Sequence, residues 1–425
     1  MCRDGLKNIS DGGTEMRSNM KNLYYDVVIA GCGVAGLYAA LNLPEEKNIL
    51  MLSKEDLESC DSMLAQGGIC VLRDESDYDS YFEDTMRAGH YENRKESVDI
   101  MIRSSRDVIN ELLNFGVRFA KNPDGSLAYT REGAHSSPRI CFHEDITGKE
   151  ITTTLLSHVK KMSNVTILTY TTMTDILEKD GRCTGMVAET KEGEILHIHA
   201  DDTIMATGGI GGLYEHSTNF PILTGDACRI AKEHGVELEH MDYVQIHPTC
   251  LYSKKPGRSF LISESARGEG AILLNHKGER FVNELLPRDV VTKAIQEEMK
   301  KEGVEHEWIS FAHVPKEIIL KHFPHIYEKC LEEGYDLLKE PAPIVPAQHY
   351  FMGGVHVNRD SATTMPNLYA VGETSCNGVH GKNRLASNSL LESLVFARRA
   401  AVKIQNKEKG NKNHELKSNY HAACC

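Results

Sequence analysis

Three glycines near the start of the chain have the spacing of a turn that binds phosphate groups. Gly31, Gly33 and Gly36 follow an apolar run at residues 27–30 and lead into a second apolar segment at residues 37–43. In a strand–turn–helix unit the first glycine permits the tight turn, the second lets a pyrophosphate approach the backbone, and the third lets the helix pack on the strand. The free N–H groups at the helix start then face the phosphates. The motif predicts dinucleotide binding, and a glycine-rich turn without a ligand is the alternative.

The residue that would identify the dinucleotide is displaced. The next apolar run, residues 48–52, is the second strand of such a unit, and that strand should end in an acid that binds the ribose of NAD or FAD. Here the strand is followed by Ser53 and Lys54, and Glu55 comes one position late. This departure weakens the interpretation of the turn as a plain NAD site.

A second group of polar residues, on distant segments, has the types that bind anionic groups. Its members are Gln245, His247, Ser263, Glu264, Arg267, Arg288, His349 and Arg384. An arginine presents a planar, always charged fork that binds a carboxylate through two hydrogen bonds, which a lysine cannot do. For any one of these residues taken alone, a surface ion pair or a satisfied histidine is the alternative.

Composition excludes several classes of protein. The 425 residues are 40% hydrophobic and 26% charged, which is typical of a globular protein of two or three domains. A net charge of −13 without a basic patch argues against binding of nucleic acid or of an anionic membrane. The uncharged run at residues 27–43 is too short and too broken by glycines to predict a membrane span. No secretory signal is visible at residues 1–22, so we expect a cytoplasmic protein.

Cysteine usage agrees with that location. The chain has twelve cysteines, but it has no CxxC pair and no spacing typical of a metal site. We therefore expect nearly all of them to be reduced and structural, and we expect no metal.

Hydrophobic periodicity predicts a parallel sheet assembled from distant segments. Buried strands are expected at residues 24–30, 48–52, 203–206 and 368–371, and helices at 37–43, 77–115, 226–234, 289–301, 315–332 and 387–404. Gly116 is expected to cap the second helix. Short strands at 165–170, 174–178, 183–189 and 194–199 suit a meander. The mixed composition of residues 241–348 indicates an inserted second domain.

Four segments, together with the glycine turn, resemble the fumarate reductase/succinate dehydrogenase flavoprotein family. They are Ser-Met-Leu-Ala-Gln-Gly-Gly-Ile at 62–69, Ala-Thr-Gly-Gly at 206–209, Leu-Tyr-Ala-Val-Gly-Glu at 368–373 and Arg-Leu-Ala-Ser-Asn-Ser-Leu-Leu-Glu at 384–392. The resemblance implies an α/β fold: an FAD-binding Rossmann-like domain with a parallel sheet and a β-meander, plus an inserted α+β capping domain. We expect a flexible leader at 1–23, the discontinuous FAD-binding domain at 24–240 and 350–410, the capping domain at 241–349 and a polar tail at 411–425.

The resemblance also implies which residues bind FAD. They are Gly31, Cys32, Gly33, Val34, Ala35, Gly36, Lys54, Asp61, Ser62, Ala65, Gln66, Gly67, Gly68, Thr172, Met173, Asp226, Glu373, Ser389 and Leu390. A carboxylate at a strand end, such as Glu373, can accept hydrogen bonds from ribityl hydroxyls, although a solvated acid is the alternative. Covalent members of the family attach FAD through a histidine five residues before the glutamine of Ala-Gln-Gly-Gly. Asp61 occupies that position here, so we expect non-covalent FAD.

Within the family, residues 384–392 are most similar to the members that oxidise L-aspartate to iminoaspartate, the first step of NAD (quinolinate) biosynthesis. The resemblance implies that Arg288 moves a proton beside the β-carbon of the substrate. It also implies that the substrate is bound by Glu132, Gln245, His247, Ser263, Glu264, His349, Arg384, Ser387 and Ser389. Within this set, Arg384 supported by His247 and His349 would clamp one or both carboxylates of the dicarboxylate substrate. Oxygen or fumarate would reoxidise the flavin, and the imine would pass to quinolinate synthase.

Glu132 separates two branches of the family. It lies in Thr-Arg-Glu-Gly-Ala-His at 130–135, where the aspartate-oxidising members carry a carboxylate and the succinate enzymes do not. A carboxylate near C2 would pair with the ammonium group that distinguishes aspartate from succinate. The alternative is a loop acid in a solvated turn.

Two other functions stay open. A soluble fumarate reductase or succinate dehydrogenase subunit would use the same fold, and Glu132 and residues 385–389 argue against it. A flavin-binding electron carrier or sensor without turnover has no need of the dicarboxylate clamp. Longer aspartate-oxidising members carry a C-terminal helical domain, which we do not expect here, because only about twenty-five polar residues follow Ala400.

Overall fold

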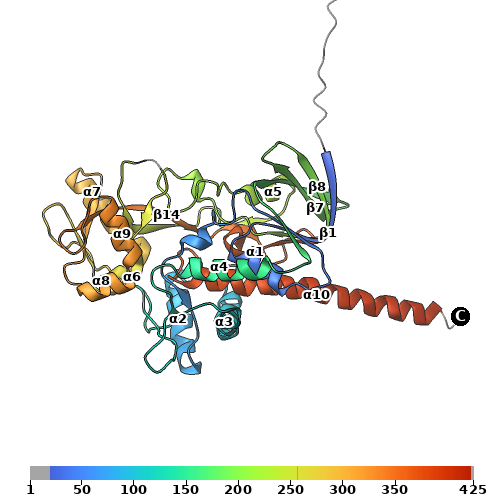
Figure 1. Cartoon of the computed structure of the whole chain (residues 1–425), viewed down its shortest axis with the longest axis horizontal. Helices are drawn as coiled ribbons and strands as arrows, with labels where there is room; N and C mark the ends of the chain where they lie inside the picture. Colours follow the sequence, from blue (N-terminus) through green and yellow to red (C-terminus); the bar gives the residue numbers. More distant parts are fainter. Residues whose placement is uncertain (1–19, 256, 423–425) are drawn as a thin grey trace, which may run out of the picture.

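A seven-stranded sheet forms the centre of the larger part of the molecule (Figure 1). The computed structural model describes residues 20–255 and 257–422. The strand order is β5-β2-β1-β8-β7-β6, and β16 also pairs with β8. The strands are β1 (Met20–Ala30), β2 (Ile49–Leu52), β5 (Val165–Leu168), β6 (Thr171–Lys179), β7 (Arg182–Thr190), β8 (Ile195–Met205) and β16 (Leu368–Ala370). Pairing is parallel except within β6-β7-β8, so the sheet joins a parallel half to an antiparallel meander.

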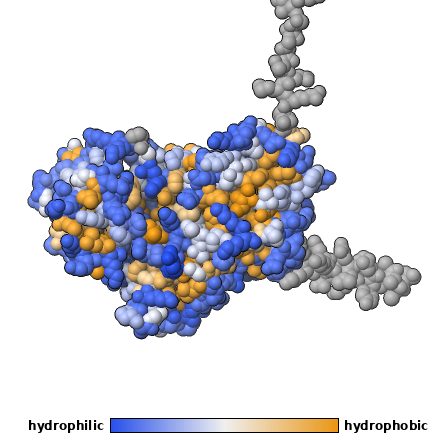
Figure 2. Space-filling model, viewed as in Figure 1, coloured by the Kyte–Doolittle hydropathy of each residue, from blue (hydrophilic) through white to orange (hydrophobic). Residues whose placement is uncertain are grey.

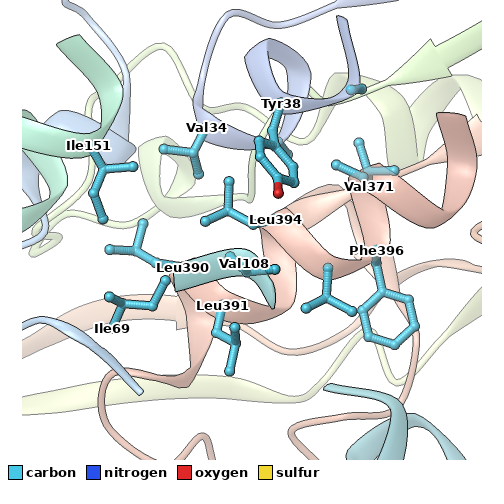
Figure 3. Packing of buried hydrophobic residues seen from close by; sticks show 14 of the residues in the cluster. Val34, Tyr38, Ile69, Val108, Ile151, Val371, Leu390, Leu391, Leu394 and Phe396 are labelled. Carbon is cyan, nitrogen blue, oxygen red and sulfur yellow. The ribbon is translucent and has the colours of Figure 1, made fainter. Parts of the chain in front are cut away.

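Helices cover one face of this sheet. They are α1 (Val34–Asn42), α4 (Thr147–Val159) and α10 (Asn388–Ala422), and α1 packs on both α4 and α10. Helices α2 (Tyr78–Ala88) and α3 (Lys95–Phe115) lie beyond α10, with α3 packed on α10 and α2 on α3 (Figure 1). Figure 3 shows Val34 and Tyr38 of α1 facing Leu390 and Leu394 of α10, all four within one buried apolar cluster. This packing fixes the start of α1, where the glycine turn lies. Helix α5 (Asp226–Glu233) packs on the other face, with the meander.

A second sheet is formed by residues 244–351. Its strands are β10 (Val244–Leu251), β11 (Phe260–Leu261), β12 (Ile272–Leu274), β13 (Glu307–Ser310) and β14 (Ala342–Phe351), in the order β11-β10-β14-β13-β12, and every pairing is antiparallel. Its helices are α6 (Glu264–Gly268), α7 (Arg288–Glu302), α8 (Lys316–His322) and α9 (Pro324–Glu332). An apolar cluster of its own, which includes Ile295 and Ile309, forms its core.

Short elements complete the described chain. They are β3 (Ile69–Cys70), β4 (Ile140–Cys141), β9 (Leu238–Glu239), β15 (Gly354–His356) and β17 (Ser375–Cys376), with single 3-10 turns at Asp61–Leu64, Glu75–Asp77, Gly211–Leu213 and Gly372–Thr374. Figure 2 shows polar side chains over most of the viewed face, with apolar patches between them. No helix among the described residues is long and apolar enough to cross a bilayer. The nine cysteines of this part of the chain are free thiols, and no metal-binding group of side chains occurs within it.

Several predicted boundaries were wrong. Strand β1 begins at Met20, because residues 20–25 continue the pairing with β8, so the end of the expected leader is part of the sheet. The rest of the leader, 1–19, lies outside the described residues, as do Cys424 and Cys425. The expected strands 194–199 and 203–206 form one strand, β8. The run at 165–170 is not part of the meander, because β5 pairs in parallel with β2 at the opposite edge.

Helix predictions erred at local breaks. The expected helix 77–115 is two helices, because His90 and Tyr91 adopt positive φ values of 58° and 60° between them. The expected helix 315–332 is interrupted before Pro324, which begins α9. Helix α10 continues beyond residue 404 into the expected polar tail. Gly116 caps α3 in the left-handed conformation with φ 96°, as predicted.

Candidate functional site

The glycine turn has no room for side chains. Gly31 has φ +117°, and a Cβ atom there would lie 2.0 Å from the carbonyl oxygen of Ala206. A Cβ atom on Gly36 would lie 2.0 Å from the carbonyl oxygen of Gly31. Helix α1 starts directly after Gly33, and its Val34 N–H donates to the Ser62 hydroxyl at 3.1 Å. The turn therefore brings bare backbone and the positive end of α1 to the surface of the adjoining cavity.

One cavity contains both sets of predicted residues. Its walls include residues 31–35, Lys54, Asp61, Ser62, Ala65, Gln66, Gly67, Gly68, Thr172, Met173, Asp226, Glu373 and Leu390 from the first set, and Glu132, His247, Ser263, Glu264, Arg288, His349, Arg384, Ser387 and Ser389 from the second. Gly36 does not line it, because this glycine serves the packing of α1 on β1. Gln245 does not line it either and contacts Arg288 from behind. The structure thus brings the phosphate turn and the polar cluster to a single site.

Acidic and amide groups aimed into the cavity lack partners. Asp61 accepts the Phe220 N–H at 2.9 Å through Oδ1, and its buried Oδ2 has no hydrogen-bond partner among the described residues. The buried Oε1 of Gln66 is also unpaired there. Burial raises the pKa of Asp61 to about 7 and that of Glu373 to about 8. Buried acceptors of this kind need donors, and the hydroxyl-rich chain and ring N–H of FAD would supply them.

Lys54 follows the second strand, where an acid was expected, and forms an ion pair with Asp226. Its ammonium donates to Asp226 at 2.8 Å, to the Thr224 hydroxyl at 2.9 Å and to the carbonyl oxygen of Ile222 at 2.9 Å. Asp226 is the first residue of α5 and therefore lies at the positive end of that helix. This pair places one cation and one carboxylate at the cavity wall, two groups that can bind phosphate and ribose hydroxyls respectively.

Arg288 is held from two sides. It is the first residue of α7 and is only 6% exposed. Its Nε donates to Glu264 Oε2 at 2.5 Å, and its Nη1 donates to Gln245 Oε1 at 2.9 Å. Glu264 also lies 3.6 Å from Arg267, which is buried. These charges hold the pKa of the Glu264 carboxyl below its usual range despite its burial, Arg288 being the larger contributor. The guanidinium is thereby fixed at the cavity wall.

Arg384 forms no ion pair with any residue that the structure describes. It is buried, its Nη1 donates to the Ser389 hydroxyl at 3.3 Å, and its guanidinium lies 4.7 Å from the ring centre of Tyr350. Its Nε has no hydrogen-bond partner among the described residues. Burial, followed by the charge of Arg288, lowers the pKa of Arg384 to about 10, so the side chain is still charged at neutral pH. A buried, unpaired cation of this kind calls for an anionic ligand.

The two histidines of the cluster are uncharged. Their rings pack edge to face with centres 5.1 Å apart. Burial, and then the charge of Arg288, lowers both pKa values well below 6.5. The Nδ1 of His247 accepts the Thr249 N–H at 3.2 Å, so its proton lies on Nε2, which is buried without a partner in the described structure. His247 is therefore a neutral donor free for a ligand, whereas His349 shares a hydrogen bond of 2.7 Å with Thr218.

Glu132 is a buried acid of the site and not a solvated loop acid. It is 4% exposed and accepts hydrogen bonds from Ser265 at 2.8 Å and from Ser387 at 2.5 Å. Burial, and then the charge of Glu264, raises its pKa. The site therefore carries one carboxylate that is paired only with hydroxyls, in the same cavity as Arg288 and Arg384. The arrangement can bind a ligand that has carboxylates and one cationic group.

Sequence reasoning missed several residues that line the cavity. They include Thr207, Gly208, Thr218, Asn219, Arg258 and Tyr350. Thr207 and Gly208 belong to a motif that the sequence analysis used, and Tyr350 follows His349 directly, so their positions could have been predicted. Arg258 lies in an irregular segment between β10 and β11 where no motif or periodicity pointed to it.

Comparisons with known proteins give the same relationship at the level of sequence and fold. A family model described as an FAD binding domain matches residues 26–390. An L-aspartate oxidase of Clostridium perfringens is 52% identical over 380 residues, which are 89% of this chain and 86% of that protein. An L-aspartate oxidase of Clostridium acetobutylicum is 47% identical over 93% of this chain and 92% of that protein. A variant of the FrdA subunit of E. coli quinol fumarate reductase has a TM-score of 0.85 at 31% identity, covering 91% of this chain and 71% of that one. Mycobacterium smegmatis Sdh1 has a TM-score of 0.78 at 31% sequence identity, and the match covers 91% of this chain and 69% of that one.

Proposed function

The chain belongs to the L-aspartate oxidase family, and from this membership we propose how its residues carry out the FAD-dependent oxidation of L-aspartate to iminoaspartate. FAD, when bound, takes up the two electrons and the hydrogen that leave C2 of the substrate. The observation that carries the assignment of roles is the charge pattern of the cavity. Among the described residues it contains an arginine that forms no ion pair and a buried carboxylate paired only with hydroxyls, and aspartate offers carboxylates and one ammonium.

Arg384 binds one carboxylate of the substrate through its guanidinium. The unpaired Nε2–H of His247 donates to the same end of the molecule, and His349 adds a second neutral donor. Neutral histidines suit this role, because they donate hydrogen bonds without adding positive charge beside two arginines. Together these groups orient C2 within the cavity.

Glu132 binds the ammonium group. Its two serine partners keep the carboxylate in one orientation, and a fixed charge needs no rearrangement when the substrate arrives. Succinate lacks the ammonium and brings only negative charge to this position. Glu132 therefore selects the amino acid over succinate, which argues against the alternative of a soluble fumarate reductase or succinate dehydrogenase subunit.

Arg288 handles the proton beside the β-carbon: loss of that proton together with the C2 hydride gives the enamine tautomer of iminoaspartate, and the imine forms when C3 regains a proton and the nitrogen loses one. Glu264 and Gln245 hold its guanidinium in place from behind, and Glu264 in turn lies beside Arg267. The row Arg288–Glu264–Arg267 offers acidic and basic atoms in succession along which a proton can leave the cavity. The retained arginines also argue against a flavin carrier without turnover.

The proposal also covers the domains, the attachment of FAD, the location of the protein and the fate of the product. Residues 24–240 and 350–410 form the FAD-binding domain, and residues 241–349 form a capping domain. FAD is bound without a covalent bond, because Asp61 cannot replace a tethering histidine. The protein acts in the cytoplasm, oxygen or fumarate reoxidises the flavin, and iminoaspartate passes to quinolinate synthase for NAD biosynthesis.

Release of ammonia tests this function. Iminoaspartate hydrolyses in water to oxaloacetate and ammonia, so the FAD-loaded protein should release ammonia from L-aspartate when oxygen or fumarate is supplied. Arg384→Leu is the matched variant, and it should lose this activity while it keeps its yellow colour. Absence of ammonia with both acceptors, from protein that carries FAD, would contradict the assignment.

A further inference from the structure

A buried ion-pair network lies behind the loop that carries Glu132. Arg139 is completely buried, with its Nη1 2.7 Å from Asp84 and its Nη2 2.9 Å from Asp77. The hydroxyls of Ser80 and Ser137 accept from the same guanidinium at 2.7 and 2.8 Å. A buried cation whose N–H groups are satisfied in this way is held rigidly, because any displacement would break several charge-assisted hydrogen bonds.

Arg139 also fixes the protonation of His135. Its Nη1 lies 3.1 Å from the Nδ1 of His135. A guanidinium can only donate, so Nδ1 accepts and the ring proton lies on Nε2. That Nε2–H donates to the carbonyl oxygen of Ala386 at 3.0 Å. Burial lowers the pKa of His135 to about 4, so the ring is a neutral donor of fixed tautomer at neutral pH.

The carbonyl group that His135 holds precedes a strained residue. Ser387 has φ +60°, a left-handed conformation that residues with a side chain rarely adopt. Its own carbonyl oxygen accepts the Cys70 N–H at 3.0 Å, and its hydroxyl donates to Glu132 at 2.5 Å. The strained conformation thus points the hydroxyl at the carboxylate, and it persists because the surrounding hydrogen bonds hold both neighbouring peptide groups.

The loop at residues 132–139 and the segment at residues 386–388 therefore hold each other at two points. One is the hydrogen bond from Ser387 to Glu132, and the other is the bond from His135 to Ala386. His135 does not line the cavity, so it acts on the substrate only through these neighbours.

We infer that His135, oriented by Arg139, is a positioning residue for substrate choice: it keeps Ser387 in the conformation that fixes the Glu132 carboxylate opposite the ammonium group of the substrate. This inference rests on the proposed role of Glu132. It predicts that loss of the Nε2 donor loosens Glu132 and lowers the preference for aspartate over succinate, with FAD still bound.

Two polar substitutions separate the functions of the ring nitrogens. His135→Asn keeps an acceptor near Nδ1 but does not reach Ala386, whereas His135→Gln keeps an N–H near Nε2. Affinities for aspartate and succinate are measured anaerobically on the FAD-loaded variants. We expect the affinity for aspartate to fall about tenfold in His135→Asn, which is the scale of one buried hydrogen bond. The affinity of this variant for succinate should change little, and both affinities of His135→Gln should stay close to those of the parent protein. His158→Asn is the control, because His158 also contacts a backbone carbonyl oxygen, that of Phe115, at 2.8 Å but lies outside the cavity walls.

Several outcomes would overturn the inference. Equal effects of Asn and Gln, or equal losses of aspartate and succinate affinity, would make His135 merely structural. If the Asn variant does not fold, Ser387→Ala tests the same link, and an unchanged aspartate-to-succinate ratio there would contradict it. Glu132→Gln distinguishes failure of the proposed Glu132 role from failure of the His135 role. If this variant leaves the aspartate-to-succinate affinity ratio unchanged, the proposed role of Glu132 itself is wrong. If Glu132→Gln lowers the ratio and His135→Asn does not, only the positioning role fails.

Discussion

The charge of Glu132 should set the choice between aspartate and succinate, and Glu132→Gln removes that charge while it keeps the shape. The side chain is 4% exposed, so its pairing with the substrate ammonium takes place away from bulk water. At an effective dielectric constant of about 20, unit charges about 4 Å apart attract by about 4 kcal/mol. Breaking such a buried pair costs about 2–5 kcal/mol. Aspartate affinity should therefore fall about 30-fold or more.

Succinate should respond in the opposite sense. Glu132 repels its carboxylates, so the variant should bind succinate as well as the parent or better. The free energy of unfolding should stay unchanged or increase, because burial and Glu264 already disfavour the charged form of Glu132. The assay is anaerobic titration of the FAD-loaded protein with each dicarboxylate, followed by the flavin spectrum. Equal loss of affinity for both ligands would refute the reasoning and would make Glu132 a structural residue.

Three further predictions follow from the same geometry. Arg288→Leu should bind FAD normally and lose turnover by several orders of magnitude, since a fixed charge and a proton-handling group both vanish from the cavity wall; near-normal kcat would move that role to another residue. Acid precipitation should release all the yellow colour into the supernatant, because Asp61 cannot tether the flavin, and colour in the pellet would contradict this. Burial raises the pKa of Glu373 and of Glu392 to about 8, so each of these groups should lower the unfolding free energy of the FAD-free protein as the pH rises from about 4.5 through 8, by up to about 1.4 kcal/mol per pH unit. The lowered pKa values of His135, His247 and His349 act in the opposite sense below pH 6.5, so calorimetry between about pH 6.5 and 8 compares the protein with Glu392→Gln. The variant should lose less unfolding free energy over this range, and equal losses would contradict the raised pKa of Glu392.

Much of the fold could be predicted because its signals are local. The glycine turn has one physical solution, since a side chain at Gly31 or Gly36 would collide with a carbonyl oxygen 2.0 Å away. The buried strands read as continuous apolar runs, as expected of a sheet covered on both faces. Strand β16, far along the chain, was predicted to return to the first sheet, and it pairs with β8.

The pairing of strands and the breaks between helices were harder to predict from the sequence, because they depend on contacts between distant segments. Nothing in residues 165–168 distinguishes a strand of the meander from one that pairs in parallel with β2. The break between α2 and α3 places two non-glycine residues, His90 and Tyr91, at positive φ, which their residue types do not predict. Charged residues continue α10 through a segment whose composition favoured an irregular tail.

In the site, residue types predicted the chemistry, but they could not predict the distances. The clamp was expected from Arg384 and the histidines, and the structure adds that the arginine forms no ion pair within the described part of the chain. Gln245 was expected to bind substrate, yet it contacts Arg288 from behind. The solvated alternative for Glu132 could be rejected only once the structure placed Ser265 and Ser387 against it.

The most direct test of the central claim is a single anaerobic experiment. The FAD-loaded protein is mixed with L-aspartate or with succinate, and the flavin absorbance is followed through one reduction. Rapid bleaching by aspartate, with little or none by succinate, is the result that the geometry of Arg384 and Glu132 predicts. Bleaching by succinate in preference to aspartate, or by neither ligand, would contradict it.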